Sequence, residues 1–230
     1  MAPDDVTPGG RRYSRWVRAY LWATERLYHE FAWAYDAVSA LVSLGRWNSW
    51  RNLALEHVRG PRVLELGFGT GALLVEMARR GLMPVGLERS AQMQRAAARR
   101  LRRAGLQVAR VRADAAAMPF ADGLFDSAVS TFPSGYVLQP TVLAEVARVL
   151  QPPSEGRPDR PRLVIGGLLV EVKSPLLARL PWLAAPGSAD RLLQRLDERA
   201  RAAGFVCRVV RHRAGGATVP VFLLEKMDGS

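Results

Sequence analysis

The sequence has little that could form a metal centre or a covalent crosslink. Its 230 residues include one cysteine, Cys207, and three histidines, His29, His57 and His212. A single cysteine excludes an intrachain disulfide and any site made of paired cysteines. The histidines stand far apart in the sequence and show no metal-ligand spacing, so no metal is predicted.

Long apolar segments are also missing. No run approaches the roughly 20 apolar residues that span a bilayer. The first residues, MAPDDVTPGGRR, include two acids and no apolar core of a secretory signal peptide. We therefore expect a cytoplasmic protein, and its length predicts one domain with a well-buried core.

Lysine is scarce. It occurs only at Lys173 and Lys226, so arginine supplies nearly all of the 33 basic residues behind the net charge of +12. This bias is typical of a GC-rich genome and does not by itself indicate a phosphate-binding surface. Two arginine clusters stand out, RRYSRWVR near the start and RAAARRLRRAG at 95–105, and the second has helical spacing that predicts a solvated outer face. A nucleic-acid partner is not expected.

Three segments of the chain differ in residue composition and hydrophobic pattern. Residues 1–10 are expected to be a disordered tail, residues 11–59 are helical and rich in aromatic side chains, and residues 60–230 alternate short apolar runs with amphipathic segments. Strands are predicted at 62–67, 84–88, 107–114, 123–131, 162–172, 205–213 and 219–227, and helices at 72–81, 90–103, 140–150 and 189–203. This alternation predicts a doubly wound, mostly parallel α/β sheet that ends in an antiparallel hairpin.

The first strand leads into a glycine-rich turn. In VLELGFGTGALL (63–74) the glycines Gly67, Gly69 and Gly71 separate the strand from a helix. Glycine lets the backbone approach a ligand, and the helix N-terminus offers N–H groups. Because ligands bind at the carboxyl ends of the strands in such sheets, Glu88 at the end of the second strand is a candidate for the two ribose hydroxyls of a nucleoside.

Two cofactors fit this turn. Gly67-x-Gly69-x-x-Ala72 satisfies the dinucleotide fingerprint in its alanine variant, so NAD is one candidate. A pyrophosphate cofactor, however, has no ammonium group to offer to Glu65, which lies two residues before the first glycine. A carboxylate there suits an ammonium group, and Asp114 in DAAAMPF (114–120) suits an adenine.

Five motifs carry a family resemblance: VLELGFGTG, VGLERS, ADAAAMPF, FDSAVS and EVARVLQP, in this order. Together they resemble the class I S-adenosylmethionine-dependent methyltransferases, and most of all the branch of the ubiquinone/menaquinone-biosynthesis methyltransferases. The resemblance implies a seven-stranded Rossmann-like sheet with an N-terminal helical lid at 11–59, S-adenosyl-L-methionine as cofactor, and methyl transfer as activity.

The resemblance also implies roles around the glycine turn. Gly67, Gly69 and Gly71 would underlie the methionine part of the cofactor, Glu65 would lie near its amino group, and Glu88 would bind the ribose.

Four further positions follow from the same resemblance. Asp114 would bind the adenine amine with the Ala115 N–H nearby, and Met118 would pack against the adenine. Tyr35, in FAWAYDAVSALVSLGRW (31–47), would belong to the lid, although it could equally be part of a buried helix face.

The acceptor is not defined by any motif. TFPSGYVLQP (131–140) replaces the acceptor segment of known subfamilies, and within it Tyr136 could face the acceptor. We expect a small-molecule or lipid-like acceptor, with no catalytic base assigned. The alternatives are an RNA or protein methyltransferase, which the charge favours, and a non-catalytic cofactor-binding module.

Membrane contact and oligomeric state stay open. Arginines, tryptophans and tyrosines alternate within residues 11–50, and SPLLARLPWLAAP (174–186) is a second apolar segment, which includes Trp182. They could form a surface that lies on an anionic membrane, or they could pack on the sheet and over the active site.

Overall fold

The computed structural model describes residues 47–133, 135–153, 160–167, 171–172, 188–214 and 217–228. The predicted tail 1–10, most of the lid segment with Tyr35, and the apolar segment 174–186 lie outside the described residues. Within these ranges, no helix is both long and apolar enough to cross a membrane.

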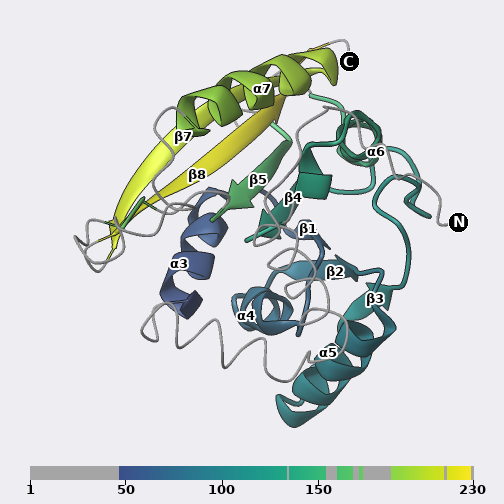
Figure 1. Ribbon diagram of the computed structural model, residues 1–230. Helices are drawn as coiled ribbons and strands as arrows, with labels where there is room; N and C mark the ends of the chain where they lie inside the picture. Colours follow the sequence, from purple (N-terminus) through teal and green to yellow (C-terminus); the bar gives the residue numbers. More distant parts are fainter. Residues whose placement is uncertain are drawn as a thin grey trace, which may run out of the picture.

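Helices and strands alternate as the sequence predicts (Figure 1). The helices are α3 (Trp47–Leu53), α4 (Ala72–Arg79), α5 (Ala91–Arg103), α6 (Pro140–Val149) and α7 (Ser188–Ala202), with 3-10 turns η1 (Ala54–His57) and η2 (Gly135–Leu138). The strands are β1 (Arg62–Leu66), β2 (Met83–Leu87), β3 (Ala109–Val111), β4 (Ser127–Thr131), β5 (Arg162–Gly166), β6 (Glu171–Val172), β7 (Phe205–Ala214) and β8 (Ala217–Lys226).

All strands join one sheet in the order β3-β2-β1-β4-β5-β8-β6, and β7 also pairs with β8. The first five strands are parallel, and β8 is antiparallel to β5, β6 and β7. The doubly wound sheet with its terminal hairpin is therefore confirmed. Strand β1 has β2 on one side and β4 on the other, so the strand order reverses at its carboxyl end, where such sheets bind ligands.

Three predicted strands have clearly different bounds. The run 123–131 keeps only β4, which begins at Ser127. The run 162–172 is divided because Gly167 has a φ of +73° and follows the end of β5, while β6 pairs with β8 further along the chain. The run 107–114 keeps only β3, so Asp114 lies in the loop beyond the strand. The N-cap predicted at Ser90 is confirmed, since its Oγ accepts a hydrogen bond of 3.4 Å from the Met93 N–H.

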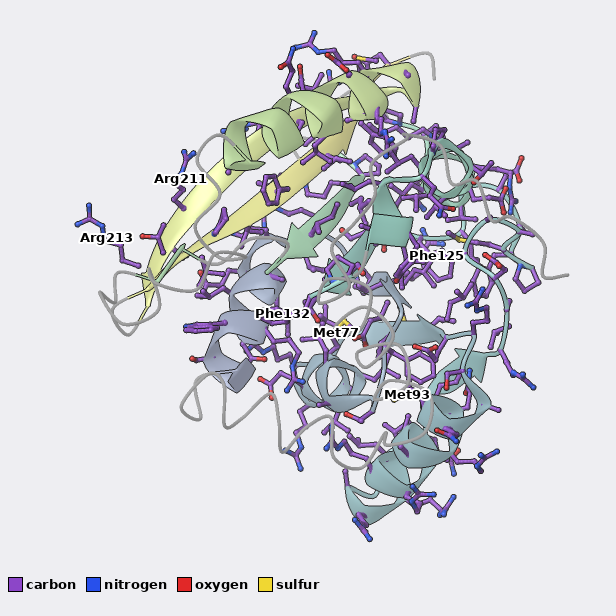
Figure 2. The ribbon with its side chains drawn as sticks, viewed as in Figure 1. Met77, Met93, Phe125, Phe132, Arg211 and Arg213 are labelled. Atoms are coloured by element: carbon purple, nitrogen blue, oxygen red, sulfur yellow. The ribbon has the colours of Figure 1, made fainter. Side chains whose placement is uncertain are left out.

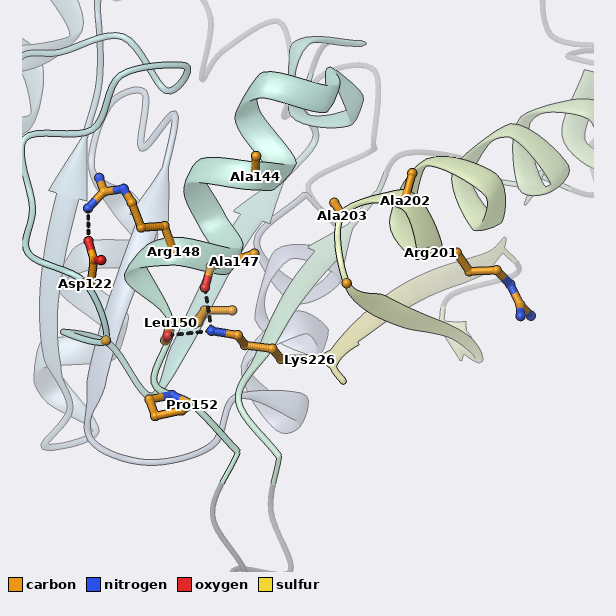
Figure 3. Close-up of a pocket in the computed structure, with 12 residues that line it drawn as sticks. Asp122, Ala144, Ala147, Arg148, Leu150, Pro152, Arg201, Ala202, Ala203 and Lys226 are labelled. Atoms are coloured by element: carbon orange, nitrogen blue, oxygen red, sulfur yellow. Dashed lines mark hydrogen bonds and ion pairs between the residues drawn. The ribbon is translucent and has the colours of Figure 1, made fainter. Parts of the chain in front are cut away.

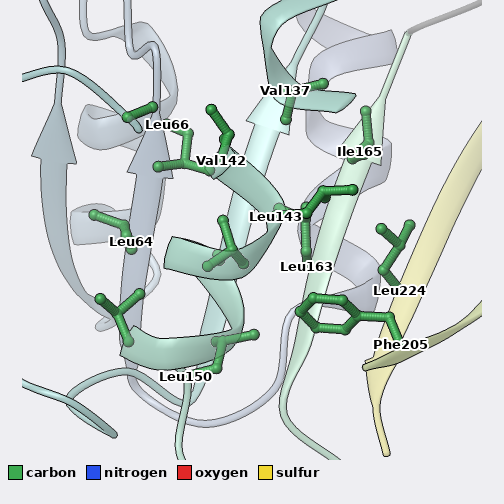
Figure 4. Close-up of a cluster of buried hydrophobic side chains, with 14 of the residues drawn as sticks. Leu64, Leu66, Val137, Val142, Leu143, Leu150, Leu163, Ile165, Phe205 and Leu224 are labelled. Atoms are coloured by element: carbon green, nitrogen blue, oxygen red, sulfur yellow. The ribbon is translucent and has the colours of Figure 1, made fainter. Parts of the chain in front are cut away.

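Apolar side chains cover both faces of the sheet. On one face, Leu64 and Leu66 of β1 pack with residues of α6 and α7, as Figure 4 shows for part of this cluster. On the other face, Val63 packs with residues of η1, α4 and α5. Because side chains alternate along a strand, Glu65 points to the same face as Val63. An acid therefore occupies a position where the pattern would otherwise place an apolar residue.

Several arginines lie exposed on α5 and β7. On α5, Ala97 and Leu101 are buried while Arg99, Arg102 and Arg103 are exposed, which confirms the predicted amphipathic helix. Arg211 and Arg213 likewise extend outward from β7 (Figure 2).

Candidate active site

The glycine turn connects the carboxyl end of β1 to α4. Gly67, Gly69 and Gly71 have φ values of +67°, +53° and +76°, a region in which side chains other than glycine are strained. The Gly67 N–H donates to the Leu87 carbonyl at 2.8 Å, which fixes the turn against the end of β2. The turn therefore lies at the point where the strand order reverses.

Each glycine of the turn has a different environment. A Cβ on Gly67 would collide with the hydroxyl of Tyr136, and a Cβ on Gly71 would stand 2.7 Å from the Cβ of Ala97 on α5. Gly69 has no atom within 4 Å of that position. Only the middle glycine is thus open on its side-chain side, and that is the place where a ligand could approach the backbone.

Glu88 is held in a fixed orientation beside the turn. Glu88 is 4% exposed. Its Oε1 accepts a hydrogen bond from the Ser90 N–H at 2.7 Å, and its Oε2 accepts one from the Gly69 N–H at 3.3 Å. Each carboxylate oxygen has more than one acceptor direction, so a diol can bind as well. The Gly69 N–H donates to Glu88. It therefore does not bind an anionic ligand, although glycine turns of this kind often use such N–H groups for that purpose.

Glu65 is buried, and one oxygen of its carboxyl group lacks a hydrogen-bond partner among the described residues. It is 2% exposed, and its Oε2 has no hydrogen-bond partner among the described residues. Burial raises the pKa of this carboxyl to about 8, while the charge of Arg51 acts in the opposite direction and Glu88 adds to the rise. An unpaired buried carboxyl group destabilises a fold, so its presence indicates a partner that the protein binds.

The hydroxyl of Tyr136 also lies at the glycine turn, against Gly67. Tyr136 lies on η2, and its buried Oη has no hydrogen bond of good geometry to the described residues. The neighbouring Ser130 hydroxyl donates its own proton to the Leu66 carbonyl at 2.9 Å. Burial, together with the charges of Glu88 and Glu65 and against the opposing effect of Ser130, raises the pKa of Tyr136 to about 12. The hydroxyl is therefore protonated at neutral pH.

Backbone strain marks the segment that leads to Tyr136. Phe132 directly follows β4 and has a φ of +50°, while its N–H donates to the Gly166 carbonyl at 2.7 Å. A bulky residue with positive φ is rare, and such strain tends to accumulate at functional sites.

The predicted adenine residues follow β3. The Asp114 side chain is exposed; its Oδ1 accepts from the Ala116 N–H at 2.9 Å, and its Oδ2 lies 3.9 Å from an Arg89 nitrogen. Ala115 and Met118 are 6% and 5% exposed and belong to the main core cluster. The Met118 N–H donates to Glu145 Oε2 at 2.6 Å. All three lie in the loop that follows β3, but an adenine contact stays a prediction.

Comparisons with known proteins agree with this geometry. Residues 63–153 match a family model described as a methyltransferase domain. A demethylmenaquinone methyltransferase from Thermus thermophilus is 36% identical over 134 residues, covering 55% of this chain and 60% of that protein. The namesake from Renibacterium salmoninarum is 34% identical over 130 residues, covering 55% and 53%. The chain thus spans less than two thirds of the length of these relatives.

Solved structures show the same fold. The cyclase SpnF has a TM-score of 0.58 at 21% identity and covers 80% of this chain and 82% of its own. A geranyl diphosphate methyltransferase in complex with sinefungin has a TM-score of 0.56 at 17% identity, covering 77% and 78%. The 1,6-didemethyltoxoflavin-N1-methyltransferase of Burkholderia thailandensis has a TM-score of 0.57 at 17% identity, covering 96% and 93%. The match over residues 63–153 and the shared fold thus both point to a methyltransferase domain.

A hollow of about 790 Å³ lies at the amino ends of the parallel strands, away from the glycine turn (Figure 3). Its charged groups are engaged within the protein. Arg148 contacts Asp122, Glu145 and two carbonyls; Lys226 Nζ donates to the carbonyls of Ala147 and Leu150; and Arg201 pairs with Asp197. We therefore place the active site at the glycine turn and not in this hollow.

The structure brings together Glu65, Glu88 and the glycines, as the sequence predicts, and adds Tyr136 to them. The sequence offered Tyr136 only as a residue that could face the acceptor. Its closeness to Gly67 depends on how η2 packs after β4, which no local pattern shows.

Proposed function

We propose that this chain transfers a methyl group from S-adenosyl-L-methionine to a small-molecule or lipid-like acceptor. The observation that carries the proposal is the buried carboxyl group of Glu65, whose Oε2 has no partner among the described residues. An amino-acid moiety supplies the ammonium group that this carboxyl needs, whereas NAD supplies none.

The residues present fit the two halves of this cofactor. Glu65 would bind the ammonium group of the methionine part, and the open side of Gly69 would let that part lie on the backbone. Glu88, whose carboxylate is oriented by the Gly69 and Ser90 N–H groups, would bind the ribose hydroxyls. We assign the adenine to the loop of Asp114, Ala115 and Met118.

Tyr35 is proposed to complete the site from the lid segment.

Positioning is the main task of the chain in this reaction. The bound sulfonium supplies an electrophilic methyl group, so much of the rate can come from holding the acceptor in line with it. Tyr136 is suited to orient an acceptor by donating a hydrogen bond, because its raised pKa keeps the hydroxyl protonated. The same property makes it a poor general base, and we assign that role to no residue.

The acceptor class rests on the names of similar proteins. The relatives are named for a menaquinone precursor, and two structural neighbours for geranyl diphosphate and a toxoflavin precursor. These are small, largely apolar or ring-shaped molecules. The neighbour named a cyclase shows that this fold also serves other chemistry, so cofactor binding without methyl transfer is the second candidate.

Calorimetry tests the cofactor. The wild-type chain is expected to bind S-adenosylmethionine and S-adenosylhomocysteine but not NAD. Glu65→Gln is expected to weaken both about tenfold or more, the scale of a hydrogen bond to a charged group. The matched control is Glu76→Gln, because Glu76 lies on α4 directly after the turn but forms a surface pair with Arg80 at 2.8 Å. Binding of NAD and not of the sulfonium compound would contradict the proposal.

Mass spectrometry tests the reaction. Incubation with labelled cofactor and candidate quinone, prenyl and heteroaromatic acceptors should give a product heavier by one methyl group. Tight cofactor binding with no product from any of the acceptors would favour the second candidate. Co-flotation with anionic liposomes at low salt, where charge attraction is least screened, would support an acceptor taken from a membrane surface.

A further inference from the structure

The fold brings together two histidines that are far apart in the chain. His57 ends η1 and His212 lies on β7, 155 residues later. Their Nε2 atoms are 2.8 Å apart, and the rings meet edge to face with centroids 5.1 Å apart. The sequence shows no ligand spacing between them because the pairing depends entirely on the packing of η1 against the hairpin.

An acid completes the group. Glu56 precedes His57, and its Oε2 lies 3.9 Å from His212 Nδ1. One ligand atom from each of Glu56, His57 and His212 lies within 4.8 Å of the other two. The Glu56 side chain is 56% exposed and that of His212 is 19% exposed, so an ion can enter from solvent.

We propose that Glu56, His57 and His212 bind a divalent transition-metal ion of the zinc class. Two imidazole nitrogens and one carboxylate oxygen are the donors that such ions prefer, and solvent would supply the remaining ligand. Two nitrogens on a tetrahedral zinc ion stand roughly 3.3 Å apart, given Zn–N bonds of about 2.0–2.1 Å. The observed separation therefore needs to open by only about half an ångström, which small ring rotations provide.

Binding requires a proton to move. In a hydrogen bond between two neutral imidazoles, one Nε2 carries the proton and the other accepts it. Both Nε2 atoms bind the ion only after that proton leaves Nε2 to solvent and the Nδ1 atom of the same ring takes up a proton, so that both rings stay neutral. Glu56 Oε2 lies 3.9 Å from His212 Nδ1, so its exposed side chain must turn toward the two Nε2 atoms to bind the same ion. No bond to carbon changes, and no oxidant or reductant takes part.

Neighbouring cations oppose the ion but have other partners. Arg59 donates from Nη1 to the carbonyls of Glu56 and Val58 at 3.3 and 3.2 Å, and Arg162 pairs with Glu225 at 3.2 Å. These contacts engage both guanidinium groups elsewhere. The ion would link the segment that precedes β1 to the C-terminal hairpin. It would therefore stabilise the fold and take no part in methyl transfer.

Titration of the metal-free full-length chain with ZnCl₂ and CoCl₂ tests this proposal. We expect one ion per chain, a dissociation constant below about 10 µM, and a rise in the thermal unfolding midpoint. His57→Ala and His212→Ala should each weaken binding at least tenfold and abolish that rise, and Glu56→Gln should weaken it less. The visible spectrum of bound Co²⁺ should lose intensity in each histidine variant.

Two residues provide matched controls. His29→Ala removes the remaining histidine and Cys207→Ser removes the only thiol, and both variants should bind zinc as the wild type does. His212→Gln repeats the test with a side chain that keeps much of the bulk on β7. Absence of binding at about 100 µM zinc, or unchanged affinity in His57→Ala and His212→Gln, would overturn the proposal. No readout depends on the cofactor, so this result is independent of the proposed function.

Discussion

Buried polar groups at the two ends of the parallel strands are hydrogen-bonded to different degrees. At the amino ends, Lys226 is 6% exposed yet donates to two carbonyls, and the Asp126 carboxylate accepts from the backbone and side chain of Arg62. At the carboxyl ends, Glu65 and Tyr136 bury polar atoms that have no hydrogen-bond partner among the described residues.

This difference separates structural from functional burial. A buried polar group with all its partners stabilises one arrangement of the chain. A buried group that lacks a partner costs stability, and a protein keeps it where a ligand completes the site. The hollow at the amino ends has its charged groups paired within the protein, so the incomplete hydrogen bonding at the carboxyl ends is the stronger indication of function.

Gly67→Ala should give the largest effect, because it strains the turn and fills the space of the Tyr136 hydroxyl. We expect a loss of about 3 kcal/mol in the free energy of unfolding and loss of cofactor binding, measured by denaturant titration and calorimetry. Adding Tyr136→Phe, which removes only the colliding hydroxyl, should restore part of the stability.

Gly81→Ala is the matched control, since Gly81 has a φ of +77° but no atom within 4 Å of the place where a Cβ would stand. It should cost about 1 kcal/mol through strain alone. Equal losses for the two single variants would show that the Tyr136 contact contributes nothing.

Asp126→Ala probes the amino ends. It leaves the Arg62 N–H and guanidinium group without their acceptor, so we expect a loss of about 2–3 kcal/mol in unfolding free energy. Cofactor affinity of the folded protein should not change. Asp228→Ala, which breaks an exposed pair with Arg160, should cost less than about 1 kcal/mol. A change in cofactor affinity for Asp126→Ala would contradict the view that buried polar groups at the amino ends have only a structural role.

Glu88→Ala probes the carboxyl ends. We expect cofactor affinity to fall by about 1.5–3 kcal/mol, because the ribose loses a hydrogen bond to a charged group. Glu76→Ala on the surface of α4 should leave affinity unchanged. An unaltered dissociation constant in a correctly folded Glu88 variant would remove this residue from the ribose role.

The pH dependence of Glu65 should give the most gradual effect, spread over several pH units. Its folded pKa of about 8 lies above the ordinary value of 4.5, so the folded state holds the proton that the unfolded state loses. Its contribution is fully present below pH 4.5 and declines towards pH 8, by at most about 1.4 kcal/mol per pH unit. The thermal unfolding midpoint should therefore fall as the pH rises across this range, and Glu65→Gln should reduce this dependence on pH.

Cofactor binding should also release protons from Glu65. At pH 7 the free carboxyl group is protonated, and an ammonium group beside it favours the ionised form. Calorimetry in buffers of different ionisation enthalpy should therefore show release of up to about one proton per ligand in the wild type and less in Glu65→Gln. Identical heats in all buffers would assign the ammonium to another partner.

The sequence predicted the strands, helices and glycine turn because their signals are local. Apolar runs bounded by glycine define β1 and β2, and the Ser90 cap defines the start of α5. The bounds of β3 and β5 were less predictable. Their ends depend on which residues find a partner strand, and that is decided by β2 and β8 and not by the runs themselves.

The site was predictable only in part for the same reason. Glu65 and Glu88 stand at fixed offsets from strand ends, so the topology of the sheet brings them together. The position of the Tyr136 hydroxyl against Gly67 and the meeting of His57 with His212 depend on contacts between distant segments.

The sequence by itself determined the alternation of strands and helices, the glycine turn and the acids near two strand ends, because each is encoded within a few residues. Only the tertiary structure decided which buried polar groups would lack a partner. Burial and hydrogen bonding are properties of the packed chain: the same glutamate is an ordinary acid in the sequence and an incomplete, high-pKa group once the folded chain surrounds it.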